Sequence, residues 1–329
     1  MEYKILDKYN IQDYLYTIPS IKGYFDEQKL FVDEIGDGNL NYVFIVKSTV
    51  DVKKALILKQ AVPYLRCVGE SYPLSKDRMT YEIRALKNFT DSSSSYIPKL
   101  YDTNEDMSTV IMQFLNEHII LREGMMKKVV YPKFSDHIST YLASNLFKTS
   151  SLNLNSSEKR ELIDNFNQNT ELCKLTEDFV FTFAFMEHDT NDESCKNSID
   201  FKELVEDMQF KKEVLSLKYK FMTQNDALVH GDLHTGSIML NEHETFVIDP
   251  EFAFVGPYGF DIGALLGNLT MSYVSHTTLK TNDDYTLWLI NTITEVLEKF
   301  EDKFLTLWQE KKESALLTNG FIDDEHLEF

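Results

Sequence analysis

The sequence reads VHGDLHTGSIM at residues 229–239 and FVIDPE at residues 246–251. In each segment a short apolar run ends at an acidic residue, Asp232 in the first and Asp249 in the second, and Gly236 marks a turn between them. Short apolar runs bounded by turn residues are typical of short strands. The two acids are therefore expected at loop ends, which are common places for functional side chains.

Three carboxylates form the candidate chemical centre. Asp232 follows His230-Gly231 and could accept the proton of an attacking hydroxyl or orient that hydroxyl, so we interpret it as the base. Asp249 and Glu251 lie two residues apart, and in an extended segment such side chains point the same way. Two carboxylates on one side suit a hard cation such as Mg²⁺, so we interpret these two as metal ligands.

Neighbouring polar residues in this region are given supporting roles. His230 is predicted to be a hydrogen-bonded structural residue and not a second base. Asp261, within GFDIG at residues 259–263, is predicted to cap a helix or to hold the catalytic loop in place. His234 fits two interpretations, because it could support the loop or face a substrate.

Composition narrows the classes of partner. The chain has 329 residues, of which 43% are hydrophobic, and a formal net charge of -20. This acidity argues against nucleic acid or an anionic membrane as a partner, since both need a broad basic surface. Three widely spaced cysteines show neither metal-ligand spacing nor a disulfide framework, which suggests a reducing compartment. With no run of about twenty apolar residues and no signal-peptide core, a cytoplasmic protein is expected.

Strand patterns dominate the N-terminal part. A helix and loop are expected over residues 10–27, strands over 30–35, 42–46, 55–59 and 109–115, a helix over 75–86, and a solvated loop over 91–95. After residue 116 helices are predicted over 134–147, 157–166, 201–223 and 285–312, with a weak capping signal at Ser157 and Glu161 and a loop over 189–200. The pattern indicates an α+β protein with a strand-rich N-terminal lobe, residues 1–115, and a mainly helical C-terminal lobe, residues 116–329.

Two features of the N-terminal part could bind a nucleotide. The turn at residues 36–41 contains two glycines, which let backbone N–H groups approach phosphate oxygens, although a purely structural hairpin turn is the alternative. Lys59 ends a predicted strand, and Glu82 lies on the next predicted helix. A lysine held by a glutamate in this way binds nucleotide phosphates in kinases. The alternative is that Lys59 extends to solvent and Glu82 is a surface acid.

These segments together resemble the 5-methylthioribose kinase family. The matching segments are residues 36–44, 58–61, 230–238 and 249–254, with further similarity at 68–74 and 171–178, and the resemblance runs from about residue 14 to residue 308. Aminoglycoside and choline kinases share the broader protein-kinase-like fold. They usually carry Pro-Gly-Asn where this chain has Thr235-Gly236-Ser237.

The resemblance implies a reaction, its cofactors and the residues that bind them. It implies ATP- and Mg²⁺-dependent phosphorylation of the anomeric hydroxyl of 5-methylthioribose, in methionine salvage, by a homodimer. Asp232 would meet the sugar hydroxyl, and Asp249 and Glu251 would hold Mg²⁺. The nucleotide would be bound by Asn41, Lys59, Gln113, Phe114, Leu115, Asp249, Pro250 and Glu251, with Gln113 to Leu115 lining the adenine.

Two departures from the family pattern leave alternatives open. Ser237 stands where most kinase-like enzymes place a metal-binding asparagine. The family carries an Arg-Arg pair near its C-terminus that contacts the substrate, whereas this chain has no arginine after Arg160. Without such a pair, the negative charge that develops in the transition state would be stabilised by Lys59 and Mg²⁺ alone. The alternatives are a kinase for another small alcohol, such as an aminoglycoside or choline, and a nucleotide-binding pseudokinase that lacks part of the sugar site.

Overall fold

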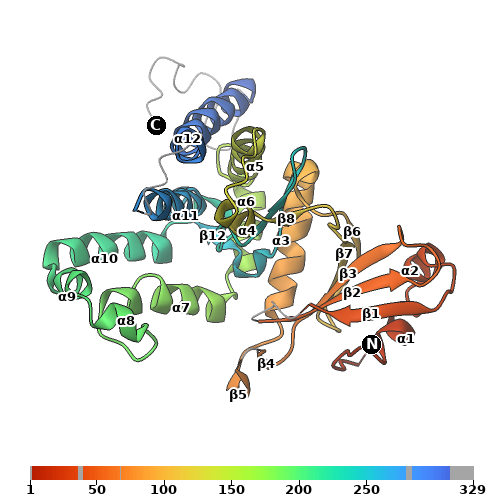
Figure 1. Cartoon of the computed structure of the whole chain (residues 1–329). Coiled ribbons are helices and arrows are strands. Elements are labelled where there is room, and N and C mark those ends of the chain that lie inside the picture. Colours follow the sequence, from red (N-terminus) through yellow and green to blue (C-terminus); the bar gives the residue numbers. More distant parts are fainter. Residues whose placement is uncertain (1, 36–39, 67, 279–283, 312–329) are drawn as a thin grey trace.

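An antiparallel sheet of five strands forms the N-terminal lobe (Figure 1). The computed structural model describes residues 2–35, 40–66, 68–278 and 284–311. The strand order is β1-β2-β3-β7-β6, and the strands span Leu30–Glu34 (β1), Tyr42–Ser48 (β2), Ala55–Gln60 (β3), Thr109–Gln113 (β7) and Leu100–Asn104 (β6). The four strands that were predicted are confirmed, and the edge strand β6 was missed.

The two faces of the sheet pack against different partners. Leu56 and Leu58 on β3 join a buried cluster with Ile11 and Leu15 of α1 (Ile11–Leu15), and with Ile21 of α2 (Pro19–Tyr24). Side chains alternate along a strand, so Lys59 emerges on the opposite face. That face is turned toward α3 (Arg78–Ser93), which lies between the sheet and the helical lobe (Figure 1).

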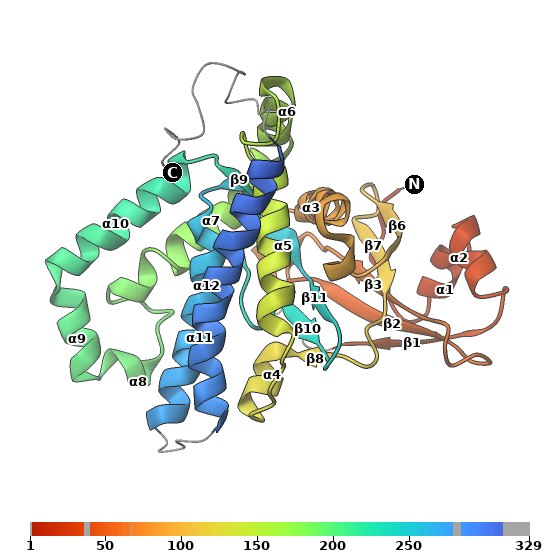
Figure 2. The same ribbon diagram turned by 90° about the horizontal axis from the view of Figure 1, so that it is seen from above.

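Helices make up most of the C-terminal lobe. Helices α5 and α12 pack side by side, with α11 beside α12 (Figure 2). The helices span Leu121–Met126 (α4), Phe134–Lys148 (α5), Ser156–Phe166 (α6), Thr170–Phe179 (α7), Glu193–Lys196 (α8), Ile199–Glu206 (α9), Met208–Thr223 (α10), Gly259–Thr278 (α11) and Asp284–Glu310 (α12). None of the helices in the described part of the chain is both long enough and apolar enough to cross a membrane.

Short strands frame the stretch that carries Asp232 and Asp249. Strand β9 (Ala227–Val229) pairs with β12 (Phe254–Gly256), and β10 (Ile238–Leu240) pairs with both β11 (Thr245–Val247) and β8 (Ile119–Ile120). The loop that carries Asp232 therefore runs from β9 to β10, and Asp249 follows β11. Both acids lie at loop ends, as predicted. A further hairpin, β4 (Tyr64–Leu65) with β5 (Gly69–Pro73), was not predicted.

Several predicted boundaries were wrong. The single helix over 201–223 is broken, because Asp207 ends α9 and its side chain accepts the N–H groups of Gln209 and Phe210 to cap α10. The loop over 189–200 contains α8 and the start of α9. Helix α6 is capped by Asn155 with Glu158, and not by the Ser157 signal.

The serine-rich segment over 91–95 is helical and not a loop, and only Asp91, Ser94 and Ser95 are exposed as predicted. Helix α3 continues to Ser93 and a 3₁₀ turn spans Ser94–Tyr96. Ser92 and Ser93 are buried, and both donate hydrogen bonds to Oδ1 of Asn145 on α5. A polar composition suggested exposure, but these hydroxyls find their partner on a helix that is distant in sequence.

Gln60, at the end of β3, ties the N-terminal segment to the sheet. It is fully buried, its Oε1 accepts the N–H of Leu6 at 2.7 Å, and its Nε2 donates to the carbonyls of Lys4 and Met107 at 2.9 and 3.0 Å. The substitution Gln60→Leu keeps the volume but leaves three backbone groups without a partner. We expect it to lower the free energy of unfolding by about 2–4 kcal/mol in urea titrations.

The matched control for this substitution is Gln209→Leu, on the exposed surface of α10. It should change the free energy of unfolding by no more than about 0.5 kcal/mol. Equal effects of the two substitutions would contradict the structural role given to Gln60.

Candidate active site

The candidate catalytic loop, residues 230–237 between β9 and β10, is held in place through its backbone. Oδ2 and Oδ1 of Asp261, in the first turn of α11, accept the N–H groups of His230 and Gly231 at 2.6 and 3.0 Å. His230 is fully buried, its Nδ1 accepts the N–H of Asp232 at 3.2 Å, and its Nε2 lies 2.9 Å from the carbonyl oxygen of Ile248. The structural interpretations of His230 and Asp261 are therefore confirmed.

Burial shifts the pKa of both supporting residues. It lowers the pKa of His230 to about 4, so the ring is neutral and donates from Nε2 to the carbonyl of Ile248. It raises the pKa of Asp261 from 3.8 to about 7, and the two backbone N–H donors oppose this rise. The imidazole of His230 is thus excluded as a proton acceptor at neutral pH, because both of its nitrogens are engaged.

Gly231 brings the catalytic loop against the segment that follows Asp249. Its φ is +82°, and a Cβ there would collide with the carbonyl oxygen of Phe252. Only glycine fits a left-handed position with so close a neighbour. The two loops identified from sequence therefore touch through their backbones.

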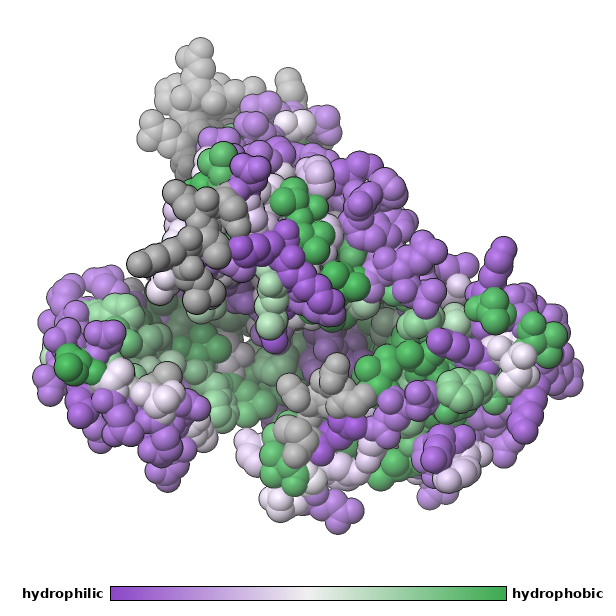
Figure 3. Space-filling model, in the orientation of Figure 1, coloured by the Kyte–Doolittle hydropathy of each residue, from purple (hydrophilic) through white to green (hydrophobic). Residues whose placement is uncertain are grey.

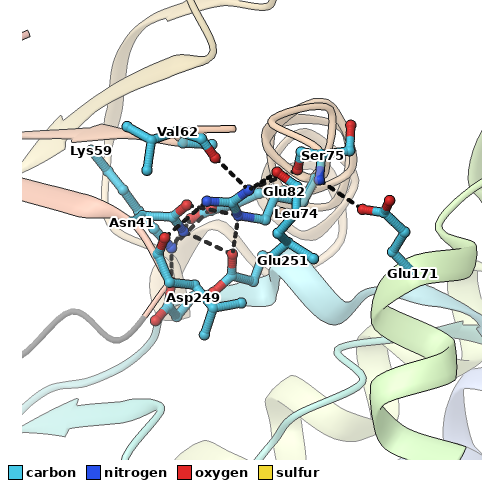
Figure 4. Close-up of polar contacts among 12 residues, drawn as sticks. Asn41, Lys59, Val62, Leu74, Ser75, Glu82, Glu171, Asp249 and Glu251 are labelled. Carbon is cyan, nitrogen blue, oxygen red and sulfur yellow. Dashed lines mark hydrogen bonds and ion pairs between the residues drawn. The ribbon is translucent and has the colours of Figure 1, made fainter. Parts of the chain in front are cut away.

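Lys59 lies at the centre of the site, where Figure 4 shows it pointing toward Glu82 and Asp249. Its Nζ donates to Oε1 of Glu82 at 2.9 Å and also pairs with Oδ1 of Asp249. The side chain of Lys59 is 6% exposed and that of Glu82 is fully buried. Burial raises the pKa of Glu82, and the adjacent ammonium of Lys59 opposes that rise. The alternative interpretation is therefore wrong, because Lys59 does not extend to solvent and Glu82 does not lie on the surface.

The segment from Asp249 to Glu251 is not extended. Asp249 has a φ of +72°, and Pro250–Phe252 form a 3₁₀ turn, so the geometric argument for parallel side chains was wrong. Asp249 faces Lys59, and its side chain is 49% exposed. Glu251 is buried, and its Oε2 accepts from Nδ2 of Asn41 at 2.7 Å. The two carboxylates thus have separate partners on the N-terminal lobe.

Arg78, which sequence reasoning missed, connects this region to its surroundings. Its Nε donates to Oδ1 of Asn41 at 2.9 Å and lies 3.6 Å from Oε2 of Glu251. Its terminal nitrogens donate to the carbonyls of Leu40, Val62, Leu74 and Ser75. The guanidinium is buried, and its partners come from separate segments, so no local sequence pattern could have identified it.

Glu82 and Arg78 share one face of α3. They are four residues apart, which places them one turn apart on the same side of a helix. From this face Glu82 reaches Lys59 and Arg78 reaches Asn41. One helix therefore supports Asn41 and Lys59, two N-terminal residues that the resemblance assigns to nucleotide binding.

The predicted adenine-binding residues connect the two lobes. Gln113 ends β7, and its Oε1 accepts the N–H of Lys99 at 3.2 Å. Phe114 lies under the ammonium of Lys47, which is 5.0 Å from the ring centre, and Leu115 is buried. The predicted glycine turn is described only at Leu40 and Asn41, because residues 36–39 lie outside the described residues.

Two segments singled out by sequence similarity meet across the lobes. A cavity of about 660 Å³ lies between β5 and α7 and is lined by residues of 71–74 and of 170–178. Beside it, the N–H of Ser75 donates to Oε2 of Glu171 at 2.8 Å (Figure 4). This contact links the end of the β4–β5 hairpin to the helical lobe.

The carboxylate of Asp249 would suit a magnesium ion that arrives with phosphates. Among the residues that the structure describes, no three or more His, Cys, Asp or Glu side chains are grouped as a complete metal site. Mg²⁺ commonly needs only one or two protein carboxylates when substrate phosphates and water supply its other ligands. The half-exposed carboxylate of Asp249 is open to such an ion, whereas the carboxylate of Glu251 is buried, accepts from Asn41 and lies 3.6 Å from Arg78.

Asp261 should make stability depend on pH in a defined direction. Its raised pKa means that the folded protein keeps this proton up to about pH 7, whereas the unfolded chain loses it near 3.8. The stabilisation is therefore complete below about pH 4 and is lost as the pH rises toward 7. Relative to Asp261→Asn, the wild type should lose at most about 4 kcal/mol of unfolding free energy between pH 4 and pH 8.

Urea titrations of both proteins at several pH values measure this difference. His230, whose lowered pKa has the opposite linkage, is present in both proteins, so the comparison isolates Asp261. The opposite result, in which the wild type gains stability relative to Asp261→Asn as the pH rises, would contradict the raised pKa. It would mean that the two N–H donors stabilise the carboxylate more than burial destabilises it.

Comparison with known proteins places the chain in a family. Residues 32–286 match the model of the phosphotransferase enzyme family. The chain is 44% identical to methylthioribose kinase of Bacillus cereus strain AH187 over 287 residues, which cover 87% of this chain and 71% of the relative. It is 46% identical to methylthioribose kinase of Bacillus thuringiensis strain Al Hakam over 254 residues, which cover 77% and 64%. With its kinase-like fold, the chain therefore belongs to the phosphotransferase enzyme family and, within it, to the methylthioribose kinases.

Proposed function

We propose that this chain phosphorylates 5-methylthioribose at its anomeric hydroxyl, using ATP, and yields 5-methylthioribose 1-phosphate and ADP in methionine salvage. The observation that carries the proposal is the 44% identity to a methylthioribose kinase over 287 residues. The relatives do not favour an aminoglycoside or choline kinase, the alternatives left open by the sequence. Support also comes from the side chains that meet between the lobes.

The nucleotide is proposed to bind between residues 1–115 and residues 116–329. Lys59, oriented by Glu82, would contact the phosphates, and Asn41 would contact them from the start of β2. Gln113, Phe114 and Leu115 would line the adenine, while Asp249, Pro250 and Glu251 would complete the nucleotide site. The adjacency of Lys59 and Asp249 supports this arrangement, because one would bind phosphate oxygens and the other the cation that neutralises the same phosphates.

Asp232 is proposed as the catalytic base. Its carboxylate would accept the proton of the anomeric hydroxyl while the sugar oxygen bonds to the γ-phosphorus and the bond from that phosphorus to the bridging oxygen breaks. Mg²⁺, held by Asp249 and Glu251, would neutralise charge on the phosphates when bound. The side chain of Asp232 is 47% exposed, so a substrate hydroxyl can reach it.

A homodimer in the cytoplasm is part of the proposal. The side chains of Met208, Leu215, Tyr219 and Met222 on α10 are exposed, and exposed apolar side chains of this kind favour association. Figure 3 shows hydrophobic residues gathered in a recess between the helices α7 to α10 and the rest of the molecule. The cysteine spacing and the use of ATP favour the cytoplasm.

The substitution Asp232→Asn tests the base. We expect kcat for methylthioribose to fall by about 10²–10⁴-fold while ATP still raises the melting temperature, because the amide cannot accept the proton. The assay is ADP release, with ribose, choline and kanamycin as comparison substrates. Asp200→Asn, on exposed α9, is the matched control and should retain wild-type turnover. Residual activity within about tenfold of the wild type would refute the base assignment.

The substitution Asp249→Asn tests the metal ligand. Removing one carboxylate charge should raise the Mg²⁺ concentration needed for half-maximal turnover by about tenfold or more, since Mg²⁺ prefers charged oxygen ligands. The measurement is ADP release across a magnesium titration at saturating ATP, with Asp200→Asn again as the control. A magnesium dependence that matches the wild type would remove Asp249 from the metal site.

A further inference from the structure

We propose that Arg122 and His234 are a positioning pair for Asp232. Arg122 holds the imidazole of His234 in one tautomer, and His234 in that tautomer orients the carboxylate of Asp232. This inference rests on the proposed function, because it concerns how the base is oriented. Arg122 lies 112 residues away from His234 in sequence, and neither the motif around Asp232 nor the predicted nucleotide site includes it.

The backbone places Arg122 beside the catalytic loop. Strand β8 pairs with β10, with Ile120 opposite Met239, and α4 begins directly afterwards. The N–H of Arg122 then donates to the carbonyl of Thr235 at 3.0 Å. The position of the guanidinium is therefore set by strand pairing and by a main-chain hydrogen bond to the loop itself.

The hydrogen bonds of His234 define its protonated nitrogen. Its Nδ1 is 2.7 Å from the N–H of Gly236 and 3.0 Å from Nη2 of Arg122. Both partners can only donate, so Nδ1 must accept and carries no proton. In the neutral ring the proton therefore lies on Nε2, which is 3.4 Å from Oδ2 of Asp232. In the proposed arrangement the protonated Nε2 faces Oδ2 of Asp232 and orients the carboxylate by electrostatic attraction, which leaves Oδ1 for a hydroxyl.

Gly236 permits this arrangement. A Cβ at this position would lie 2.6 Å from Nη2 of Arg122 and 2.8 Å from Nδ1 of His234. Any larger residue would push the guanidinium and the ring apart. The glycine in the catalytic stretch is therefore explained by the close approach of these two side chains and not by a left-handed backbone.

The pair borders solvent at the side where Asp232 is accessible. Arg122 is exposed, and the side chain of His234 is 29% exposed. Removing the side chain of Arg122 leaves no buried charge or cavity, so its variants should fold. This separates it from Asp261, which holds the backbone of the same loop from inside.

The first test is turnover of Arg122→Ala, with Arg160→Ala as the matched control because Arg160 is exposed on α6. We expect kcat to fall about tenfold in Arg122→Ala with the KM for ATP unchanged, and millimolar guanidinium to restore part of the loss. Arg160→Ala should retain wild-type values with no response to guanidinium. A wild-type kcat in Arg122→Ala would overturn the proposal, as would a loss confined to KM.

The second test uses two variants that keep opposite halves of the imidazole. His234→Gln retains an amide nitrogen near the place of Nε2, whereas His234→Asn retains an oxygen near the place of Nδ1. If the donor to Asp232 matters, the glutamine variant should keep several-fold more kcat than the asparagine variant. The reverse order, or equal values, would contradict the proposed role.

The third test does not depend on turnover. The ¹⁵N spectrum of histidine-labelled protein at about pH 8.5, where histidines are mostly neutral, reports which ring nitrogen is protonated. The signal of His234 is identified by its loss in His234→Gln. We expect a single tautomer protonated at Nε2, and a mixture in Arg122→Ala. Protonation at Nδ1 in the wild type would refute this inference, even if the protein phosphorylates methylthioribose. If the expected tautomer is observed but the protein shows no turnover, only the proposed function is refuted.

Discussion

The buried guanidinium of Arg78 makes the hydrogen bonds on which the arrangement of the segments between the lobes depends. It donates to carbonyls on both sides of the β4–β5 hairpin and to Asn41 at the start of β2, and it lies beside Glu251 of the helical lobe. A planar group with five donors can satisfy several carbonyl oxygens at once, which a lysine cannot do. Burying its charge is costly, and the carbonyls and Glu251 offset this cost. The start of β2, the hairpin and the turn after Asp249 therefore share one polar centre.

This centre also bears on how an acidic chain would bind the polyanionic nucleotide proposed above. The formal net charge of -20 belongs to the whole chain, whereas the described site gathers Lys59 and Arg78 between the lobes and Arg122 beside the catalytic loop. Charges at short range in a partly buried site outweigh a diffuse surface charge that salt screens. A negative net charge therefore counts against nucleic acid as a partner more than it counts against a nucleotide.

The sequence allowed the fold to be predicted where one local rule controlled the structure. Strands β1, β2, β3 and β7 follow apolar runs, and the pairing of Lys59 with Glu82 follows from a strand-to-helix pattern. The edge strand β6 was missed because Asp102, Thr103 and Asn104 carry no apolar signal. The extended conformation expected at Asp249 failed because a left-handed residue and a 3₁₀ turn redirect Glu251. Arg78 and Arg122 could not be predicted, since their partners become neighbours only in the folded chain.

The contact between Gly231 and Phe252 has a mechanical consequence. Because backbone meets backbone there, the loop of Asp232 and the turn of Asp249 behave as one block within the helical lobe. Lys59 belongs to the sheet, so any hinge motion between the lobes would change its distance from Asp249 and leave the spacing of the two acids fixed. In the proposed mechanism the first distance sets how the nucleotide is held and the second sets how the acceptor is aligned. A change in the segment between the lobes could therefore alter nucleotide binding without disturbing the alignment of the acceptor.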